Sequence, residues 1–552
     1  MCRFAWLLIL AVAAMCSGAC GQHAGPTSAS VASPPAAADS SAPAAHVTAE
    51  SPSHGPPPGV AWFAGGVPDA FVEAARQRKP VFVYFGAVWC PPCLELKATI
   101  FKRRDFLDHL KLFVPVYVDG DAPDAQRWMS EFHAMAYPTV LILRSDRSEI
   151  DRVAGGMNLD RYTQVLDIGL KAVRPLSQII AALDSGNAPL SLDDCRVMAF
   201  NSWQLDPSWD NTDPKSHWLD STAGVLERAS EHCPQDATLE RARLHMVGAY
   251  AAVTASAAAL KSGKPAKARL GRQVERVRSI VTDRVLADGM GDILIDMPAE
   301  LLSAVDKVDA PHAKEFRDAY FQAMARLEDD TRYSGAVRLY ATSQKVVVSK
   351  GEGEHPAVPA DVAAEAHRRV NEAMQHIPGG PEHASIVNSV EAVLDALGDK
   401  DGLSALLRDE IKTSSTPYYY MGDLAELEEE RGHKDEAIDW FARAYRESQG
   451  GATRLQWGSH YVNALIRLRP DDDAAIRSAA IQLIGEARET DGLYARSRRS
   501  LSSVADKLHT WNSGDQHQAA VAEIRKSLNE KCRSPALSDA SRAACQDVLT
   551  RI

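Results

Sequence analysis

One stretch of the chain decides the fold of its first domain: Val81-Phe82-Val83-Tyr84-Phe85, and shortly after it Trp89-Cys90-Pro91-Pro92-Cys93. The first run consists of apolar and aromatic β-forming residues, which predicts a strand that is buried on both faces. The residues from 94 to 101 have a helical pattern. The two cysteines therefore lie where a buried strand is followed by a helix.

Strand and helix signals alternate around this stretch, through residues 61–175. Strands are expected at 81–85, 112–118, 140–143 and 149–153, and helices at 71–78, 94–101, 125–132 and 159–173. The resulting order, βαβαββα, places a central sheet between helices. We therefore predict an α/β domain over 61–175.

The spacing of the two cysteines suits thiol–disulfide chemistry. A thiol attacks as its thiolate, and the N-terminus of a helix lowers the thiol pKa. Pro91 and Pro92 cost little there, because N–H groups in the first turn have no partner within the helix. Two intervening residues bring the sulfur of Cys93 back towards Cys90. We therefore predict that Cys90 attacks substrates and that Cys93 resolves the mixed disulfide.

Two other functions of this pair are less favoured. Half of a zinc site would need a second C-x-x-C or a C-x-x-H. The chain has no second C-x-x-C, and its one C-x-x-H, at residues 20–23, directly follows the predicted export signal and lies outside the predicted α/β domain. An inert structural disulfide is also less favoured, because a cross-link that closes a strained small ring at the start of a helix stabilises the fold very little. No metal and no cofactor are expected.

The motif and two downstream features resemble the thioredoxin family over residues 62–173. Tyr137-Pro138-Thr139 lies where the family has its cis-proline, and Gly155-Gly156 follows the last hairpin. Within the family, residues 90–101 are most similar to the C-terminal thioredoxin domain of DsbD, a bacterial membrane thiol–disulfide transporter. The resemblance implies a thioredoxin fold, exchange with protein thiols and disulfides, and a membrane electron-transfer partner. It also implies that Trp89, Tyr137 and Pro138 support the active site.

Three residues near the cysteines bear on the thiol pKa. Many thioredoxins have a buried Asp six residues before the first cysteine, where this chain has Tyr84. The DsbD-type domain has an acidic residue four positions after the second cysteine, where this chain has Lys97. Because nearby negative charge raises a thiol pKa and positive charge lowers it, we expect an acidic Cys90 and a couple more oxidising than cytosolic thioredoxin. Glu95 partly opposes this effect.

The N-terminus has the pattern of an export signal at 1–19. Arg3 precedes an apolar run at 4–15, and small residues follow at 17–19. Cleavage after Ala19 would leave Cys20 first, as in bacterial lipoproteins, whereas the small residues also suit ordinary signal peptidase. Residues 20–60 are rich in Ala, Ser and Pro, which predicts a disordered linker. We expect a periplasmic protein, with Cys20 as the candidate site of a lipid anchor.

Composition narrows the class of partner. The chain has 61 Lys+Arg against 73 Asp+Glu among 552 residues, a formal net charge of −12. Nucleic acid is not an expected partner, because binding a polyanion requires a basic face. Charged residues at 24% and hydrophobic residues at 45% are typical of globular protein.

Residues 176–552 show helical patterns and an internal repeat, which predict an all-α, solenoid-like region. Gly398-Asp399-Lys400-Asp401 and Gly432-His433-Lys434-Asp435 lie 34 residues apart, the tetratricopeptide period. Tetratricopeptide-like structure is therefore expected at about 386–470. The aromatic residues at 418–420 and Trp440 either line a concave binding surface or fill gaps between helices. The acidic run at 426–430 is expected on a solvated helix face.

Four further cysteines lie in the helical region: Cys195, Cys233, Cys532 and Cys545. An even number in an oxidising compartment favours pairing, and four cysteines allow three pairings. The local pairing, Cys195–Cys233 with Cys532–Cys545, closes the shortest loops and is preferred. The alternative is four buried free thiols, each acting as a small hydrophobic residue.

Two functions follow from this organisation. The first is an exported thiol–disulfide oxidoreductase whose helical region recruits partner proteins. The second is a redox-regulated periplasmic chaperone or adaptor, in which the helical region is active and the α/β domain adjusts it.

Overall fold

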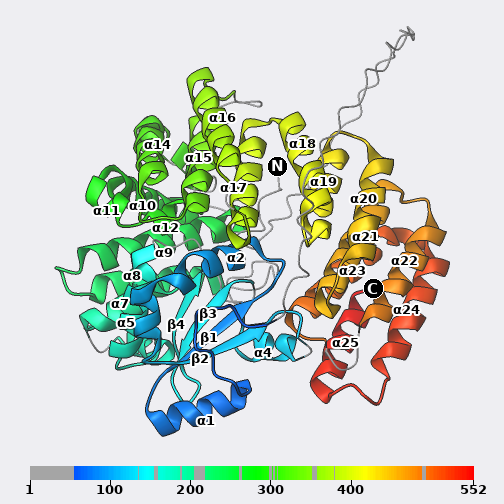
Figure 1. The fold of residues 1–552 in the computed structure, drawn as a ribbon, viewed down its shortest axis with the longest axis horizontal. Helices are drawn as coiled ribbons and strands as arrows, with labels where there is room; N and C mark the ends of the chain where they lie inside the picture. The colour runs from blue at the N-terminus through cyan, green and yellow to red at the C-terminus, as the bar shows by residue number, and fades with distance from the viewer. Residues whose placement is uncertain are drawn as a thin grey trace, which may run out of the picture.

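The computed structural model describes residues 55–122, 124–134, 136–154, 159–186, 189–203, 218–259, 264–297, 301–302, 305–306, 309–350, 357–377, 379–487 and 493–552. An α/β domain comes first, and a large helical region follows it (Figure 1). The elements of the domain are α1 (Val67–Gln77), β1 (Val81–Gly86), α2 (Pro91–Ala98), α3 (Arg104–Leu110), β2 (Val114–Asp119), α4 (Ala125–Glu131), β3 (Thr139–Leu143), β4 (Glu149–Ala154) and α5 (Leu159–Lys171). The predicted fold class is confirmed.

The four strands form one mixed sheet in the order β2-β1-β3-β4. Strand β1 runs parallel to β2 and antiparallel to β3, with Val81 opposite Val114 on one side and Leu143 on the other. Every residue of β1 is buried, as its continuous apolar run predicted. Helix α3 was not predicted, because it has only seven residues and shows only Phe106 and Leu110 on its buried face.

Both outer strands of the sheet are covered by other parts of the chain. The N–H of Phe63 donates to the carbonyl of Pro115 on β2 (2.8 Å). At the opposite edge, the N–H of Ser202 donates to the carbonyl of Arg152 on β4 (2.7 Å). These contacts pair backbone groups that would otherwise be open at the sheet edges. The second contact also fixes the start of the helical region to the α/β domain.

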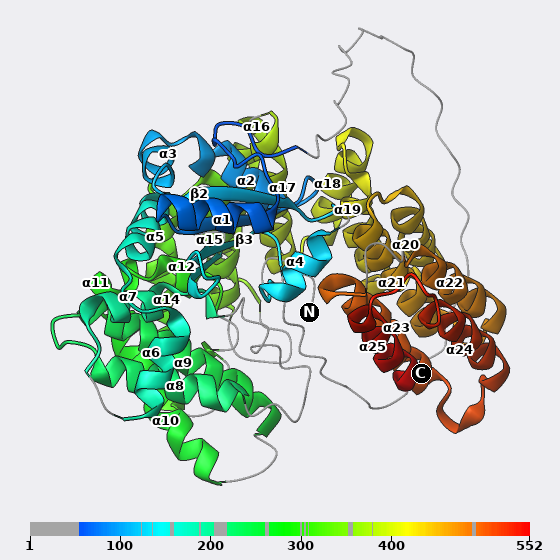
Figure 2. The same ribbon diagram turned by 90° about the horizontal axis from the view of Figure 1, so that it is seen from below.

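The helical region begins at Leu176 and continues to the C-terminus. Its first part contains α6 (Leu176–Asp184), α7 (Leu192–Phe200), α8 (Trp218–His232), α9 (Thr238–Ala259), α10 (Lys264–Thr282), α11 (Arg284–Asp288), α12 (Gly291–Leu294), α14 (Ala313–Asp329), α15 (Gly335–Ser349) and α16 (Ala360–Gln375). Its second part contains α17 (Pro381–Leu397), α18 (Lys400–Thr413), α19 (Pro417–Glu430), α20 (Lys434–Glu447), α21 (Gly451–Leu468), α22 (Asp473–Glu486), α23 (Ala495–Trp511), α24 (Gln518–Cys532) and α25 (Asp539–Arg551). Figures 1 and 2 show these helices passing around the α/β domain.

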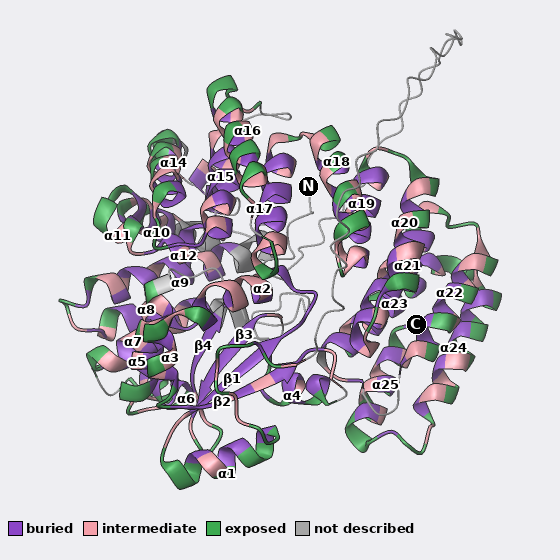
Figure 3. Ribbon diagram, in the orientation of Figure 1, coloured by how far each residue is buried: buried purple, intermediate pink, exposed green. Residues whose placement is uncertain are grey.

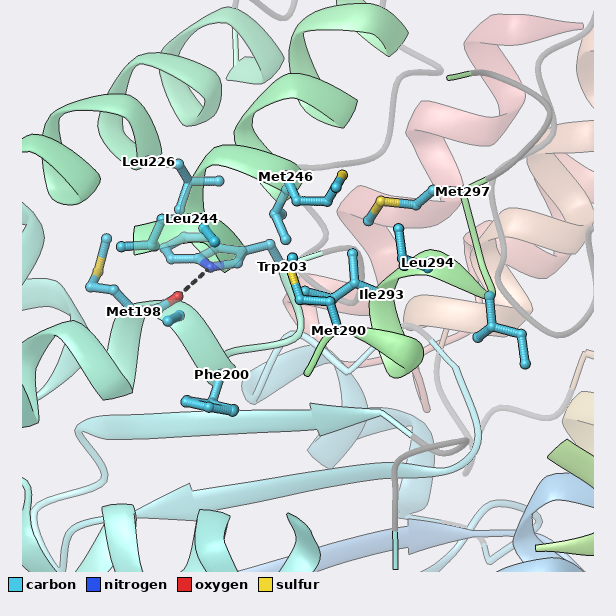
Figure 4. Close-up of a cluster of buried hydrophobic side chains, with 14 of the residues drawn as sticks. Met198, Phe200, Trp203, Leu226, Leu244, Met246, Met290, Ile293, Leu294 and Met297 are labelled. Atoms are coloured by element: carbon cyan, nitrogen blue, oxygen red, sulfur yellow. Dashed lines mark hydrogen bonds between the residues drawn. The ribbon is translucent and has the colours of Figure 1, made fainter. Parts of the chain in front are cut away.

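The first part shares a hydrophobic core with the α/β domain. Figure 4 shows Trp203 surrounded by leucine and methionine side chains of the helices, while Phe200 lies towards the sheet. The indole Nε1–H of Trp203 donates to the carbonyl of Met198 (2.8 Å), so its polar atom is satisfied inside this core. The buried residues of this cluster are continuous with those of the sheet, including Phe82 and Ile142.

The two copies of the sequence repeat follow the same backbone course. Gly398 and Gly432 end α17 and α19 with positive φ angles of 75° and 83°, a conformation that glycine adopts without strain. The matched positions Val393 and Leu427 are both fully buried. At the position where the second copy has a small residue, Glu410 is buried and contacts His383 through both carboxylate oxygens (3.1 Å each).

The second part of the helical region meets the end of the sheet that carries the cysteines. Helix α17 packs along α2, and α23 packs against α4. Every residue of α17 from Ser385 to Leu394 is buried, so this middle part of the helix is drawn in purple in Figure 3. A helix that is buried on all sides lies inside a protein rather than on its surface. This part of α17 therefore lies between α2 of the α/β domain and α15, α16 and α18 of the helical region.

Candidate redox site

Cys90 and Cys93 are joined in a disulfide at the N-terminus of α2, with 5.2 Å between their Cα atoms. Cys90 is the N-cap residue, and its Sγ accepts the backbone N–H of Cys93 (3.2 Å). Pro91 and Pro92 fill the first two helical positions and have no N–H. The first free amide of the helix therefore points at the sulfur of Cys90. In the reduced protein this amide and the helix dipole stabilise a Cys90 thiolate.

The residues expected to support the site lie beside the disulfide. Trp89 and Tyr137 meet edge to face, with 5.6 Å between ring centres. The Tyr137–Pro138 peptide bond is cis. Burial raises the pKa of the Tyr137 hydroxyl well above its usual value, so this group is neutral. The hydroxyl donates to the carbonyl of Gly120 (3.3 Å), which fixes the ring against the end of β2.

Tyr84 occupies the position of the family's buried acid and belongs to an aromatic stack. Its ring lies 5.9 Å from Trp62 and 5.8 Å from Tyr117, both in stacked orientations. Burial raises the pKa of Tyr84 far above its usual value, so the side chain carries no charge. The core under the disulfide therefore contains no carboxylate at this position.

Glu95 and Lys97 lie on α2, beyond the cysteines, and both are partly buried. Burial raises the pKa of Glu95 to about 7, although the hydroxyl of Ser334 donates to its carboxylate and opposes that shift. Burial also lowers the pKa of Lys97, and the charge of Asp119 opposes this. Because Glu95 is only partly ionised near neutral pH, its negative charge near the thiols is weaker than the sequence suggested.

Helices of the second part cover the disulfide. Cys90 is 2% exposed and Cys93 is fully buried. They share a hydrophobic cluster with residues of α19, α20 and α21, among them Tyr418, Met421, Ala444, Tyr445 and Trp457. The sequence interpretation missed this arrangement, because nothing local indicates which aromatic residues of a helical repeat face another domain.

The aromatic residues at 418–420 have separate roles. Tyr420 lies in the core between helices, as one of the two interpretations expected. Tyr418, by contrast, lies beside the redox pair, where its ring centre is 6.3 Å from that of Trp457. The ring of Trp457 occupies space that a Cβ on Gly422 would fill, since the nearest ring carbon would be only 2.1 Å from such a Cβ. Helices α19 and α21 therefore approach closely at the disulfide.

Asp121 joins the α/β domain to these helices. Its side chain is only 3% exposed. One carboxylate oxygen accepts the indole N–H of Trp89 (2.7 Å), and the other accepts the hydroxyl of Thr453 on α21 (2.8 Å). A Cβ on Gly450, which has a φ of +85°, would lie 2.5 Å from the Asp121 carboxyl carbon. The backbone of the helical region thus comes within contact distance of this carboxylate.

Arg496, at the start of α23, completes the contact. Its guanidinium carbon lies 4.5 Å from the ring centre of Trp89, in a cation–π arrangement. Its Nη1 is 3.9 Å from a carboxylate oxygen of Asp121, and its Nε donates to the side chain of Gln456 (2.7 Å). The backbone N–H of Arg496 donates to the side chain of Gln126 on α4 (3.2 Å). The side chain of Arg496 is 8% exposed, so these interactions are shielded from water.

The four cysteines of the helical region form two disulfides far from the redox pair in sequence. Cys195 is joined to Cys233 and Cys532 to Cys545, with Cα–Cα distances of 5.9 Å and 5.4 Å. All four side chains are buried. The pairing in the structure is the local one.

The acidic run at 426–430 is not wholly solvated, contrary to the expectation. Glu428 is buried and accepts hydrogen bonds from Arg408 (3.3 Å) and His433 (2.7 Å). With Glu436 these residues form a group in which three candidate metal-ligand atoms lie within 4.8 Å of one another. Arg408 also donates to Glu436 (2.7 Å), so both carboxylates already have a cationic partner. This group is a structural ion-pair network.

Several sequence predictions fall outside the described residues. These are the export signal at 1–19, Cys20, the linker up to residue 54, and Gly155-Gly156. Within the described part of the chain, none of the helices combines the length and the apolar character needed to span a bilayer.

Known proteins are similar to the α/β domain. A family model described as a thioredoxin-like domain matches residues 67–169. Thioredoxin H5 from Oryza sativa subsp. japonica is 30% identical over 88 residues, which are 16% of this chain and 61% of that protein. A thioredoxin from Griffithsia pacifica is 34% identical over 86 residues, 15% of this chain and 73% of that protein. Together with the fold and the position of the Cys90–Cys93 pair, these matches show that the chain belongs to the thioredoxin family.

Proposed function

We propose that the protein is a thiol–disulfide oxidoreductase that acts on protein thiols and disulfides through Cys90 and Cys93. The observation that carries this proposal is the hydrogen bond from the N–H of Cys93 to the Sγ of Cys90 at the start of α2. A sulfur that receives such a bond at a helix N-terminus is stabilised as a thiolate, which is the reactive form. The family membership of the domain supports the same activity.

The reaction consists of two successive thiol–disulfide exchange steps. In the reduced protein the Cys90 thiolate attacks one sulfur of a substrate disulfide, the substrate S–S bond breaks, and its other sulfur leaves as a thiolate. Cys93 then attacks the Cys90 sulfur, releases the second substrate thiol and forms the Cys90–Cys93 disulfide. Two electrons pass to the substrate. The same steps in reverse oxidise a substrate dithiol.

The proposal includes export to the periplasm and a lipid anchor at Cys20. The leader pattern at 1–19 supports export, and the Cys195–Cys233 and Cys532–Cys545 disulfides fit an oxidising compartment. A membrane electron-transfer partner would renew the redox state of the pair. We also propose that the helical region, whose 34-residue repeat is tetratricopeptide-like, selects the partner proteins.

A second function is favoured by the contact between the two regions. Because Tyr418 and Trp457 pack beside the disulfide, the redox state of the pair can influence the helical region. The protein would then be a redox-regulated chaperone or adaptor. Protection of an unfolded client that differs between the oxidised and reduced protein supports this function. Equal protection in both states is evidence against it.

Equilibration with glutathione tests the proposed oxidoreductase. The full-length protein is incubated with mixtures of reduced and oxidised glutathione, and free thiols are then alkylated and located by mass spectrometry. We expect Cys90 and Cys93 to titrate together in one two-electron step while the other two disulfides stay oxidised. If Cys90–Cys93 is no more reducible than Cys195–Cys233 once equilibrium has been reached from both the oxidised and the reduced protein, the bond is structural and the proposal is wrong.

A further inference from the structure

The redox pair is enclosed by the helices that meet it. Disulfide exchange requires a second sulfur to approach Cys90 along the axis of the breaking bond. Cys90 is 2% exposed, and side chains of α19 and α21, among them Tyr418 and Trp457, lie in the same cluster. A protein disulfide cannot reach a sulfur this deeply buried while these helices stay in place. We call the side chains of Tyr418, Met421, Tyr445, Trp457 and Arg496 the cover.

Polar contacts hold the cover to the α/β domain at Asp121 and, through the backbone N–H of Arg496, at Gln126 (3.2 Å). Asp121 binds Trp89 within its own domain and Thr453 of the helical region, and Arg496 lies 3.9 Å away. Because this carboxylate is buried, each of these contacts is stronger than it would be in water. The rest of the cover is apolar or aromatic and has little directional preference. The contacts of Asp121, together with the Arg496–Gln126 hydrogen bond, therefore provide the directional part of the interaction that keeps the cover over the disulfide.

We propose that the cover is the specificity element of the redox site. A partner protein that docks on the helical region displaces α21 and α23 from Asp121, and only then does Cys90 become accessible. Other protein disulfides react slowly because they meet the closed form. The role of the cover in specificity rests on the proposed oxidoreductase function. The enclosure of Cys90, by contrast, can be measured without any enzymatic activity.

Gly450 offers a way to open the cover without removing a polar group. A Cβ at this position would collide with the buried Asp121 carboxylate, so Gly450→Ala must displace that carboxylate, the backbone at 450, or both, and so disturb the contacts of Asp121. Gly380 provides a matched control. It is likewise a helix N-cap with positive φ (78°, against 85° for Gly450), yet a Cβ there meets nothing within 4 Å. Both variants place an alanine at a positive φ, but only Gly450→Ala disturbs Asp121.

A second pair of variants tests the charge contact. Arg496→Ala removes the guanidinium that lies over Trp89. Arg498 lies on the same helix as Arg496, and Arg498→Ala removes only an exposed ion pair with Asp547 of α25 (2.8 Å). Arg496→Lys keeps the positive charge, so the rate at which its Cys90 is alkylated should be closer to that of the parent protein than the rate of Arg496→Ala. This pair is useful if Gly450→Ala does not fold.

The readout is alkylation of Cys90 in a Cys93→Ser background. In this background Cys90 is a free thiol, and the two other disulfides need no reduction. The rate is measured with iodoacetamide across a pH range, and the plateau above the thiol pKa reports access, whereas the midpoint reports the pKa. In the parent protein, which carries only Cys93→Ser, we expect the plateau alkylation rate of Cys90 to be far below that of the glutathione thiol. In Gly450→Ala and Arg496→Ala this plateau rate should be higher by about tenfold or more. Gly380→Ala and Arg498→Ala should match the parent.

The following results separate the possible outcomes of these experiments. A parent plateau close to that of glutathione, or equal plateaus in all the variants, overturns the enclosure of Cys90. A shift of the midpoint with no change of plateau also overturns it, because Arg496 would then act on the thiol pKa alone. In the background with both redox cysteines intact, Gly450→Ala should speed insulin reduction by dithiothreitol. If alkylation responds but insulin reduction is absent in every protein, the enclosure stands and the oxidoreductase proposal fails.

Discussion

Arg496 lies over the indole ring of Trp89, with 4.5 Å between the guanidinium carbon and the ring centre. Trp89 directly precedes the redox pair, whereas Arg496 lies in the first turn of α23, in the C-terminal part of the helical region. Asp121 is the common neighbour of both side chains. The redox site is therefore built from the α/β domain and from helices that follow it by hundreds of residues, and its properties depend on both.

The stability of the protein should depend on the ionisation of Glu95. Its pKa is raised to about 7 in the folded protein, against 4.5 for an unperturbed Glu. Between these values the folded state binds more protons than the unfolded state, so the free energy of unfolding decreases as the pH rises. Urea denaturation of the wild type and Glu95→Gln at pH 4.5, 6 and 8 tests this. In Glu95→Gln the free energy of unfolding should decrease less between pH 4.5 and 8 than in the wild type. If the free energy of unfolding follows the same pH profile in both proteins, the raised pKa of Glu95 is contradicted.

The two disulfides of the helical region should stabilise it unequally. Cys195 and Cys233 are 38 residues apart, and Cys532 and Cys545 are 13 apart. In the chain-entropy model, loops of these lengths are worth about 4 and about 3 kcal/mol. Replacing both Cys195 and Cys233 by Ser should therefore lower the free energy of unfolding more than replacing both Cys532 and Cys545 by Ser. Peptide mapping without reductant should show both bonds in protein from its native compartment, whereas four free thiols would rule them out.

Lys97 should make the redox pair more oxidising. A positive charge near the site favours the thiolate and so stabilises the reduced form. Lys97→Glu should raise the Cys90 pKa and lower the reduction potential by about 30 mV, which is about 1.4 kcal/mol for two electrons. Lys111→Glu, an exposed lysine at the end of α3, is the control. Equal potentials in the two variants would mean that Lys97 does not act on the thiols.

The location of the protein should depend on Cys20. If a lipid is attached there, the wild type sediments with membranes and Cys20→Ser is released as soluble protein. Cell fractionation with an antibody against the α/β domain measures this. A wild type that is already fully soluble would remove the anchor from the proposal and leave secretion alone.

The sheet and its cysteine pair were predictable because their signals are local. The apolar run at 81–85 was sufficient for the central strand, and the C-x-x-C spacing placed the pair at the start of α2. The 34-residue repeat also located the turns of α17–α18 and α19–α20, because Gly398 and Gly432 are required by backbone geometry at each turn.

The cover of the redox site was not predictable from one sequence. Tyr418 and Tyr420 have the same local pattern, yet one faces the disulfide and the other lies in the helical core. The contact of Asp121 with Arg496 joins segments that have no shared motif. Glu428 was expected in solvent because of its acidic neighbours, but Arg408 and His433 contact its carboxylate inside the helix packing. Only tertiary contacts distinguish these positions.

The most direct test of the central claim, that Cys90 attacks and Cys93 resolves, is mixed-disulfide trapping in cells. Cys90 is the N-cap that receives the Cys93 N–H, so it is the sulfur best stabilised as a thiolate. Cys93→Ser cannot resolve the mixed disulfide and should accumulate dithiothreitol-sensitive covalent complexes on a non-reducing gel, while Cys90→Ser should accumulate none. Equal trapping by both variants, or trapping by Cys90→Ser alone, would contradict the assignment.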